Sequence, residues 1–344
     1  MRKKKVNEKK ATSEPIDVVY LWCDGTDPVF IRDKEKRAAS CGIPYKEDNA
    51  GALRFVDNEE LRYSLRSIQQ NMPWVNHIFI VTNKQYPRWM KKHPKITIVD
   101  HREIIPHELL PTFNSVVIET FVHKIPGLSK KFIYFNDDVF IKNGVLPEFF
   151  FDKDRPIVRV KKGGNFFVPV NEVKCIELLK NDSVDDFRKS LLRSWYFVNK
   201  KNGYAPWVLR VHCADPFDKN VWQECLEKYP EVLKLNISPF RGGEDVQWPL
   251  IVNLEMILHG KGTYKLQKCH TNFFIKHFNN LLKKEVDWFE GAECDKTRSR
   301  ILILNPMMFC INADIGMDDE NRRRTRNFLK KMFPIPSDFE KIQL

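Results

Sequence analysis

Apolar positions in the first 140 residues fall into short continuous runs, and amphipathic stretches separate these runs. Runs rich in Val, Ile, Tyr and Phe fit a buried pleated surface, so each predicts a strand. The predicted strands begin at residue 16 and continue with residues 77–82, 96–100 and 132–139. Apolar residues at helical spacing predict helices at 28–40, 58–68 (with Asn58 as N-cap), 87–92 and 115–123. Strands that alternate with helices indicate parallel βαβ units, hence an α/β fold with a mostly parallel sheet inside a three-layer sandwich.

The remainder of the chain is more helical and more charged. Residues 156–203 have a mixed pattern that indicates an insertion with a helix near residues 184–192. Amphipathic helices are predicted at residues 221–229, 246–258 and 318–332. We expect a flexible basic tail at residues 1–15 and one domain from 16 to 340, in which the halves 16–155 and 204–340 flank the insertion.

Composition points to a folded protein away from the membrane interior. Of the 344 residues 42% are hydrophobic, and 25 are Phe, which excludes a disordered chain. The longest apolar stretches, at 301–304 and 307–311, are much shorter than the roughly 20 residues that a spanning helix needs. The charged N-terminus has no apolar segment behind it and does not resemble a secretory signal. We therefore expect a cytoplasmic protein whose eight scattered Cys are reduced thiols.

The net charge of +12 calls for an anionic partner or a solvated basic face. Basic residues concentrate at residues 2–10, 161–162 and 322–326. Candidate partners are nucleic acid, an anionic membrane surface and a phosphate-rich substrate. Because the sequence contains no helix-turn-helix, zinc-finger or RNP-like motif, no nucleic acid partner is expected.

The predicted strand at 132–139 contains two adjacent acids, Asp137 and Asp138. Carboxylates at the end of an inner strand need a metal, another cation or donated hydrogen bonds to offset their lost hydration. Ligands dock at the carboxyl ends of strands in open α/β sheets, and two hard oxygen ligands suit Mg²⁺. The alternative is a strand followed by an ordinary Asn-Asp turn.

Asp24 and Gly25 form a sharp turn after the first predicted strand. There Asp24 could hold a uracil or ribose edge, or it could cap the helix that begins at Pro28. His212 lies in a Pro-containing loop, where it could take a proton from a hydroxyl group or serve a structural role.

Arg241 lies in a glycine-rich turn before a predicted helix and could clamp phosphate oxygens. Glu244 and Asp245 follow it and could equally be first-turn acids that favour the helix dipole. Asn312 and Asp314 are two residues apart, so an extended chain would place both on one side and let them ligate the same metal.

Four blocks, in order, resemble the Stealth family of sugar-phosphate transferases. The family includes bacterial capsular polysaccharide phosphotransferases and the catalytic subunit of the lysosomal-enzyme N-acetylglucosamine-1-phosphotransferase. The blocks run from Ile16 to Pro28, from Asn58 to Val139, from His212 to Gln247 and from Cys310 to Phe339. The third block departs from the family's common His-x-Pro, because Ala214 follows Cys213 and the proline stands at Pro216.

The resemblance implies a GT-A-like Rossmann-type core, a UDP-sugar donor, a glycan acceptor and Mg²⁺ (or Mn²⁺). A hexose- or N-acetylhexosamine-1-phosphate such as N-acetylglucosamine-1-phosphate would pass to an acceptor hydroxyl, with release of UMP, in capsular or other exopolysaccharide synthesis. Residues 16–155 would then bind the nucleotide sugar, and residues 204–340 would bind the acceptor and carry catalysis. The enzyme would lie in the cytoplasm, in peripheral contact with the inner face of an anionic membrane.

Roles follow for residues within the four blocks. Asp137 and Asp138 would hold the metal, with Asn312 or Asp314 completing its ligands. Arg241 would hold the β-phosphate, and His212 would act as general base. The remaining substrate-binding candidates are Asp24, Gly25, Arg62, Ser115, Glu244 and Asp245. Two alternatives stay open, a metal-dependent GT-A glycosyltransferase that makes a plain glycoside and a non-catalytic basic protein that binds glycan or nucleic acid.

Overall fold

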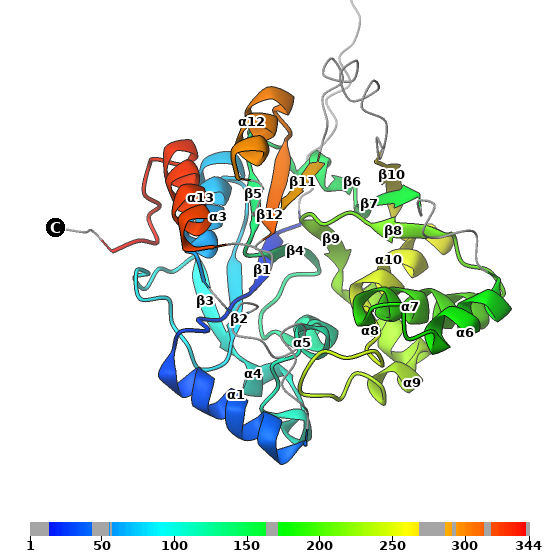
Figure 1. Ribbon diagram of the computed structural model, residues 1–344. Helices are drawn as coiled ribbons and strands as arrows, with labels where there is room; N and C mark the ends of the chain where they lie inside the picture. The colour runs from blue at the N-terminus through cyan, green and yellow to red at the C-terminus, as the bar shows by residue number, and fades with distance from the viewer. Residues whose placement is uncertain are drawn as a thin grey trace, which may run out of the picture.

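A computed structural model describes residues 14–42, 55, 57–162, 171–267, 286–290, 294–312 and 318–341. Its centre is a five-stranded sheet with the order β3-β2-β1-β4-β9 (Figure 1). These strands are β1 (Ile16–Leu21), β2 (Ile78–Thr82), β3 (Ile96–Asp100), β4 (Lys131–Asn136) and β9 (Asp215–Asp218). The first four run parallel, and β9 lies antiparallel to β4.

Helices cover both faces of this sheet. On one face α3 (Glu60–Asn71) packs with Val18 and Tyr20 of β1 in one apolar core. On the other face Val19 belongs to a second core that includes α5 (Ser115–Phe121), α8 (Lys219–Lys228) and α10 (Trp248–Leu258). Alternate β1 residues therefore enter opposite cores, as in any strand covered on both sides. The mostly parallel sheet between two helical layers confirms the predicted α/β, GT-A-like Rossmann-type fold.

Two smaller sheets flank the central one. One has the order β11-β12-β5, and the other has the order β10-β7-β6 with β8 paired to β7. Their strands are β5 (Val139–Ile141), β6 (Phe151–Asp152), β7 (Arg155–Lys162), β8 (Val208–Arg210), β10 (Thr263–Leu266), β11 (Val286–Glu290) and β12 (Met308–Asn312). The predicted division into two halves and an insertion stays a prediction, and residues 1–13 of the predicted tail lie outside the described residues.

The segment predicted as one strand at 132–139 is in fact two strands joined by a turn at residues 137–138. β4 belongs to the central sheet, whereas β5 pairs with β12. Side chains of α3 hold β5 in this second sheet: Ser64 donates to Val139 O, Ser67 accepts from Ile141 N, and Asn71 donates to Ile141 O. The prediction of a continuous strand was wrong because those partners lie about 70 residues earlier in the chain.

Among the other helices of the described residues, three confirm the helices predicted at residues 28–40, near 184–192 and at 318–332, and the rest were not predicted. These other helices are α1 (Pro28–Ser40), α4 (His101–Ile104), α6 (Glu172–Lys180), α7 (Asp186–Asn202), α9 (Pro230–Leu233), α12 (Cys294–Leu304) and α13 (Asp319–Met332), with 3-10 turns at His107–Leu109, Val122–Lys124 and Pro147–Phe149. Nowhere in the described part of the chain is a helix both long and apolar enough to span a bilayer.

Two local predictions at the N-terminal half were wrong. Residues 87–92 form no helix, because the C-terminal segment binds their backbone: Lys91 N donates to Phe339 O and Lys341 N donates to Trp89 O. Asn58 is not the N-cap of α3, since Glu59 takes that position in a left-handed conformation with φ 66°. Asn58 donates both its backbone N–H and its amide to the Glu60 carboxylate instead.

Candidate active site

The turn between β4 and β5 presents Asp137 and Asp138 at the carboxyl end of the central parallel sheet. Pairing of β12 with β5 places Cys310 opposite Val139, next to this turn. The Ile311 backbone N–H donates to the Asp138 carbonyl over 3.1 Å, and Cys310 Sγ lies 3.2 Å from Asp138 Oδ2. The chain thus changes sheets at the two acids, and strands on both sides of the turn hold it in place.

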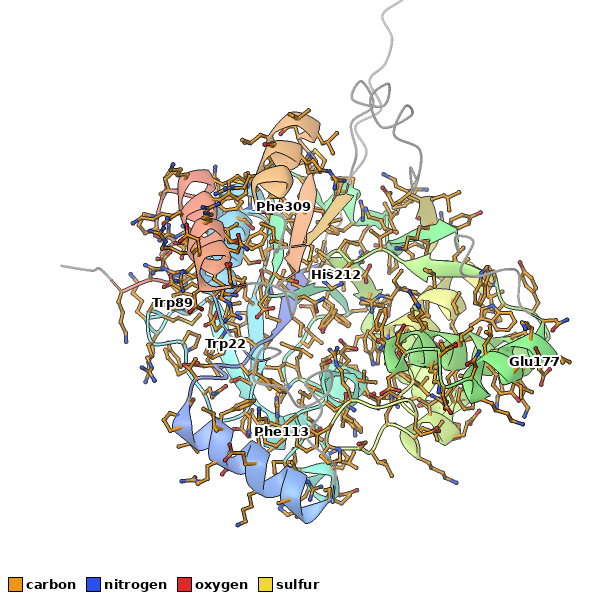
Figure 2. All side chains as sticks on the ribbon, viewed as in Figure 1. Trp22, Trp89, Phe113, Glu177, His212 and Phe309 are labelled. Carbon is orange, nitrogen blue, oxygen red and sulfur yellow. The ribbon has the colours of Figure 1, made fainter. Side chains whose placement is uncertain are left out.

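His212 joins this turn because of how β9 pairs with β4. Tyr134 lies opposite Asp215 in that antiparallel ladder, so continuing it brings the residues before β9 beside the end of β4. His212 Nε2 lies 3.1 Å from the Asn136 amide nitrogen and 3.5 Å from Asp138 Oδ1. Its side chain is 40% exposed, near the middle of the molecule in Figure 2. The structure therefore brings together Asp138 and His212, which stand 74 residues apart in the sequence.

Carboxylates crowd the same edge of the sheet. Burial raises the pKa of Asp137 well above its usual value, and the negative charges of Asp138, Glu60 and Asp57 raise it further. Burial likewise raises the pKa of Asp57 to about 6, with a contribution from Asp24, and the pKa of Glu60 to about 7, with a contribution from Asp57. Such mutual repulsion is what a bound divalent cation relieves, so these oxygen donors fit a hard ion such as Mg²⁺.

Two of the proposed metal ligands are less defined by the structure. Asn312 is the last residue of β12, two positions after Cys310. The backbone of Asn312 therefore lies at the same edge of the sheet as Asp137 and Asp138. Its side chain and the whole of Asp314 lie outside the described residues. The described residues that would hold the cation are thus Asp137 and Asp138.

Arg241 and Ser115 come together at the start of α5. The Arg241 guanidinium donates to Ser115 Oγ, with Nε at 3.1 Å. Beside them, buried Asn114 caps α5 and donates to the Asp245 carboxylate at 3.0 Å. Burial raises the pKa of Asp245 to about 6. The hydrogen bond between Asn114 and Asp245 therefore joins the loop before α5 to the loop that contains Arg241. This bond helps to position Ser115 and Arg241, which lie beside it.

Glu119 of α5 connects the Arg241 side of the site to the His212 side. Burial raises the pKa of Glu119, and the positive charges of Arg210, Arg241 and His212 act against this rise. Tyr134 donates a hydrogen bond to the Glu119 carboxylate at 2.9 Å. Arg241 and His212 thus lie within electrostatic reach of one carboxylate.

Sequence reasoning missed four of these charged groups, namely Glu119, Arg210, Asp57 and Glu60. A signal existed for Arg210, because it stands two positions before His212 and an extended chain places such residues on one side. Glu119 interrupts the apolar run of Val116 to Val122, a pattern that indicates a buried acid with a specific partner.

Asp24 and Gly25 shape the turn after β1. Asp24 Oδ1 accepts from the backbone and the hydroxyl of Thr26, at 2.9 and 2.6 Å. The helix cap belongs to Asp27, whose carboxylate accepts from Val29 N, so capping by Asp24 was wrong. Gly25 donates to Phe55 O at 2.8 Å, and a Cβ there would lie 2.1 Å from that oxygen. Only glycine fits this close approach.

Arg62 and Glu244 are engaged in ion pairs within the protein. Arg62 Nε lies 2.6 Å from Glu340 and its Nη1 lies 3.1 Å from Glu59. Glu244 lies 3.2 Å from Arg193 and is largely exposed. The roles predicted for both in substrate binding stay predictions.

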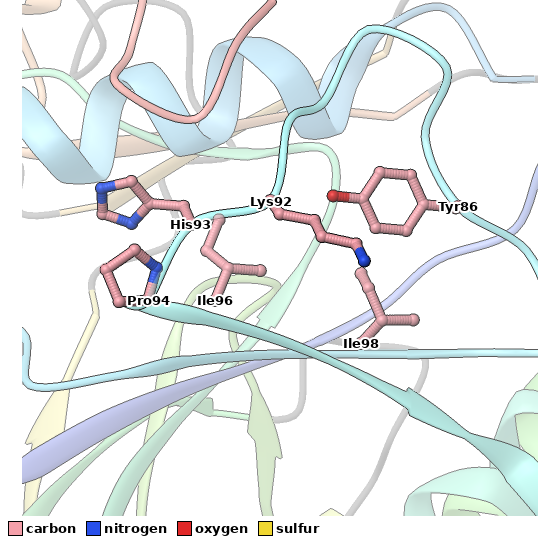
Figure 3. Close-up of a pocket in the computed structure, with 6 residues that line it drawn as sticks. All are labelled: Tyr86, Lys92, His93, Pro94, Ile96 and Ile98. Carbon is pink, nitrogen blue, oxygen red and sulfur yellow. The ribbon is translucent and has the colours of Figure 1, made fainter.

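A cavity of about 410 Å³ lies elsewhere, beside β3 (Figure 3). Tyr86, Lys92, His93, Pro94, Ile96 and Ile98 line it. It contains none of the residues that the sequence marks as catalytic, so the chemistry is assigned to the β4–β5 edge.

Comparisons with known proteins give a consistent family. Residues 14–40 match the model for Stealth protein conserved region 1, and residues 54–158 match that for conserved region 2. The chain is 46% identical over 343 residues to the capsular polysaccharide phosphotransferase LcbA of Neisseria meningitidis, covering 95% of this chain and 84% of the relative. A capsular polysaccharide phosphotransferase of Actinobacillus pleuropneumoniae is 34% identical over 74% of this chain and 69% of the relative.

An exopolysaccharide phosphotransferase of Streptomyces coelicolor is 33% identical over 95% of this chain. The chain spans about half of that relative, 52% of its length. The similarity therefore covers nearly the whole chain, and each of these relatives is named as a phosphotransferase. The chain belongs to the Stealth family, and it is a transferase of the phosphotransferase kind.

Proposed function

We propose that the protein transfers a hexose- or N-acetylhexosamine-1-phosphate from a UDP-sugar to a hydroxyl of a glycan acceptor. The product is a phosphodiester in a capsular or other cell-surface polysaccharide, and UMP is released. The observation that carries the proposal is the pairing of Asp138 with His212 at 3.5 Å, at the carboxyl end of a parallel sheet. Kinship with named capsular polysaccharide phosphotransferases supports the reaction class.

The chain's own charged groups match the needs of phosphoryl transfer, which depends on positioning and on charge neutralisation. Asp137 and Asp138 would hold Mg²⁺ (or Mn²⁺), which when bound neutralises pyrophosphate oxygens. Arg241 binds oxygens of the β-phosphate, and the hydrogen bond to Ser115 fixes the direction of its guanidinium. The uridine and sugar groups are assigned to Asp24 and Gly25 in the turn after β1.

His212 is the general base of the proposed reaction. The amide nitrogen of Asn136 lies 3.1 Å from Nε2 and Asp138 Oδ1 lies 3.5 Å from it, so both neighbours direct this ring nitrogen toward the acidic turn. Nε2 is the atom that accepts the proton in the proposed reaction. The acceptor hydroxyl loses its proton to His212 while its oxygen bonds to the β-phosphorus. The bond from that phosphorus to the bridging oxygen breaks, and UMP leaves with the electron pair.

A product analysis tests the proposal. The purified chain is incubated with a panel of UDP-sugars, Mg²⁺ and candidate glycan acceptors, and UMP and UDP are quantified. Release of UMP with a phosphodiester signal in the phosphorus NMR spectrum of the product supports it. Release of UDP with a phosphate-free product establishes the plain glycosyltransferase instead. Metal-independent binding with steep salt dependence and no nucleotide release identifies a non-catalytic binder.

We also propose a cytoplasmic location with peripheral contact to an anionic membrane. The support is the basic run at residues 322–326 on α13, although Arg323 and Arg324 pair with Glu320 and so contribute less. Deletion of the basic residues 2–10 and charge reversal on α13 should release the enzyme from vesicles rich in phosphatidylserine. Unchanged co-sedimentation would refute this contact.

A further inference from the structure

Three different ligand types meet at the β4–β5 turn. One carboxylate oxygen of Asp138, one ring nitrogen of His212 and the sulfur of Cys310 all lie within 4.8 Å of one another. The Asp138–Cys310 separation is 3.2 Å and the Asp138–His212 separation is 3.5 Å. In a tetrahedral zinc site with bonds of about 2.0–2.3 Å, ligand atoms stand roughly 3.3–3.7 Å apart. The Cys310 contact is made by Oδ2 of Asp138 and the His212 contact by Oδ1, and the sulfur and the ring nitrogen lie within 4.8 Å of each other. Two of the separations are therefore close to those of a tetrahedral site, and the third needs only a small side-chain adjustment.

We propose that Asp138, His212 and Cys310, here called the D-H-C cluster, bind a thiophilic divalent cation of the Zn²⁺ class and that this ion inhibits the enzyme. Imidazole and thiolate ligands select Zn²⁺ over Mg²⁺, which prefers oxygen. The cluster shares Asp138 with the oxygen donors assigned to Mg²⁺ and adds a nitrogen and a sulfur ligand to it. Binding exchanges one proton for the metal, as the Cys310 S–H becomes a thiolate ligand.

The backbone holds the three ligands before any ion arrives. Cys310 stands opposite Val139 in the β12–β5 ladder, and Ile311 N–H is bonded to the Asp138 carbonyl. His212 is placed by the pairing of β9 with β4. Cys310 lies in β12, and Asp138 and His212 lie in short connections next to paired strands, so the three ligands lose little conformational freedom on binding.

The exposure of the ligands gives the ion a way in. Cys310 is buried, Asp138 has a side-chain exposure of 16%, and His212 has one of 40%. An ion can therefore approach from the His212 side, where water can supply the fourth ligand. It must replace the contact between His212 and Asn136 and the hydrogen bond from the Cys310 thiol to Asp138.

The inhibition rests on the proposed function. A metal on Nε2 occupies the lone pair with which His212 accepts a proton, and it also occupies Asp138. The two residues assigned to base catalysis and to Mg²⁺ would then be blocked by one ion. Excess Mg²⁺ would compete poorly because it gains nothing from the Cys310 sulfur.

Cobalt reports the cluster directly. Titration of the full chain with Co²⁺ should give a near-ultraviolet band of thiolate-to-metal charge transfer, and Zn²⁺ should remove it. Cys310→Ser should abolish the band and weaken Zn²⁺ binding by about 100-fold or more, since it deletes a ligand. Cys41→Ser, at an exposed thiol that ends α1, is the matched control and should keep the band. A missing band in the wild-type chain, or a persistent one in Cys310→Ser, overturns the proposal.

Activity provides the second readout. In excess Mg²⁺, Zn²⁺ should inhibit UMP release by the wild type, and Cys310→Ser should need about 100-fold more Zn²⁺ for the same inhibition. Equal sensitivity of the two overturns the inhibitory role. Cys310→Ala replaces Cys310→Ser if circular dichroism shows that the serine variant is unfolded. Should no UDP-sugar release UMP, the proposed function fails, while the Co²⁺ band still decides the D-H-C cluster.

Discussion

Two groups of charge lie along helix α3 (Glu60–Asn71), and they differ in how their charges are balanced. At its start, Glu60 adds to the repulsion around Asp137, whose pKa burial and neighbouring carboxylates raise. Further along, Arg66 donates twice to Glu340 at 2.7 Å, and Arg62 donates once at 2.6 Å. Burial alone would raise the pKa of Glu340, but these hydrogen bonds and that from Ser337 N–H lower it to about 2.

The difference separates architecture from chemistry. Opposite charges with complete hydrogen bonds connect α3 to the C-terminal segment. Glu340 of this segment also forms a β-bridge with Met90. Like charges gathered at the end of β4 cannot balance one another and need an external cation or phosphate-bound metal. We therefore expect substitutions in the ion-paired group around Glu340 to change stability, and substitutions in the acidic group around Asp137 to change turnover. Four predictions test this contrast.

Asp138→Asn should give the largest effect. It keeps the shape but removes the charge that would hold the cation and face His212, so UMP release should fall by about 10³-fold. The measurement is UMP formation from the preferred UDP-sugar with saturating Mg²⁺. Asp152→Asn, in β6 with an ion pair to Arg155, is the control and should retain wild-type turnover. Full activity of Asp138→Asn would remove the acidic edge from the mechanism.

His212→Ala should lower turnover by about 10²-fold, the lower end of the range expected for loss of a general base. Donor affinity, measured by calorimetry with Mg²⁺, should change little because the cation and Arg241 remain. His259→Ala tests whether any exposed histidine matters, since His259 lies on the protein surface beside Glu255. If donor affinity collapses while turnover of bound donor persists, His212 binds substrate and is not the base.

Glu340→Gln should reduce stability by about 3–5 kcal/mol, because it leaves the buried Arg66 guanidinium without its charge partner and Arg62 with Glu59 alone. The fall in thermal midpoint measures this effect, and Glu177→Gln on the exposed face of α6 is the control. Turnover per folded molecule should stay near wild type. Lost donor binding in a stable variant would instead favour the family-derived prediction that Arg62 lines the nucleotide-sugar pocket.

The sequence predicted those features of the fold that depend on residues close together in the chain. The parallel strands and most helices were predictable because apolar spacing reports them within a few residues. The pairing of Arg62 with Glu340 was not, because 278 positions separate them. The turn at Asp137 was hidden for the same reason, since α3 and β12 impose the change of sheet on a run that is apolar on both sides.

The candidate site shows the same limit. Asp137, Asp138 and His212 stood out because acids in an apolar run and a histidine beside a proline are locally unusual. Asp57 and Glu60 did not, since acids before a helix are common N-terminal features. Their electrostatic coupling to Asp137 exists only after α3 has packed against β4 and β5.

The smallest predicted effect concerns pH and Mg²⁺. Burial raises the pKa of Asp57 to about 6 and that of Glu60 to about 7, so the folded protein holds these protons more tightly than the unfolded chain. The stability from those protons is complete below about pH 4, the unfolded pKa of a carboxyl group, and is lost as pH rises to about 7. Mg²⁺ replaces protons as the compensating charge. The stabilisation of the folded protein by Mg²⁺ should therefore grow as the pH rises from about 4 to about 7. Thermal midpoints with and without MgCl₂ should differ by a few degrees at about pH 8 and by less at about pH 5, since roughly 1 kcal/mol shifts a large domain by about 2–4 °C. Equal gains at both pH values, or an undiminished gain in Asp138→Asn, would contradict a cation at this edge.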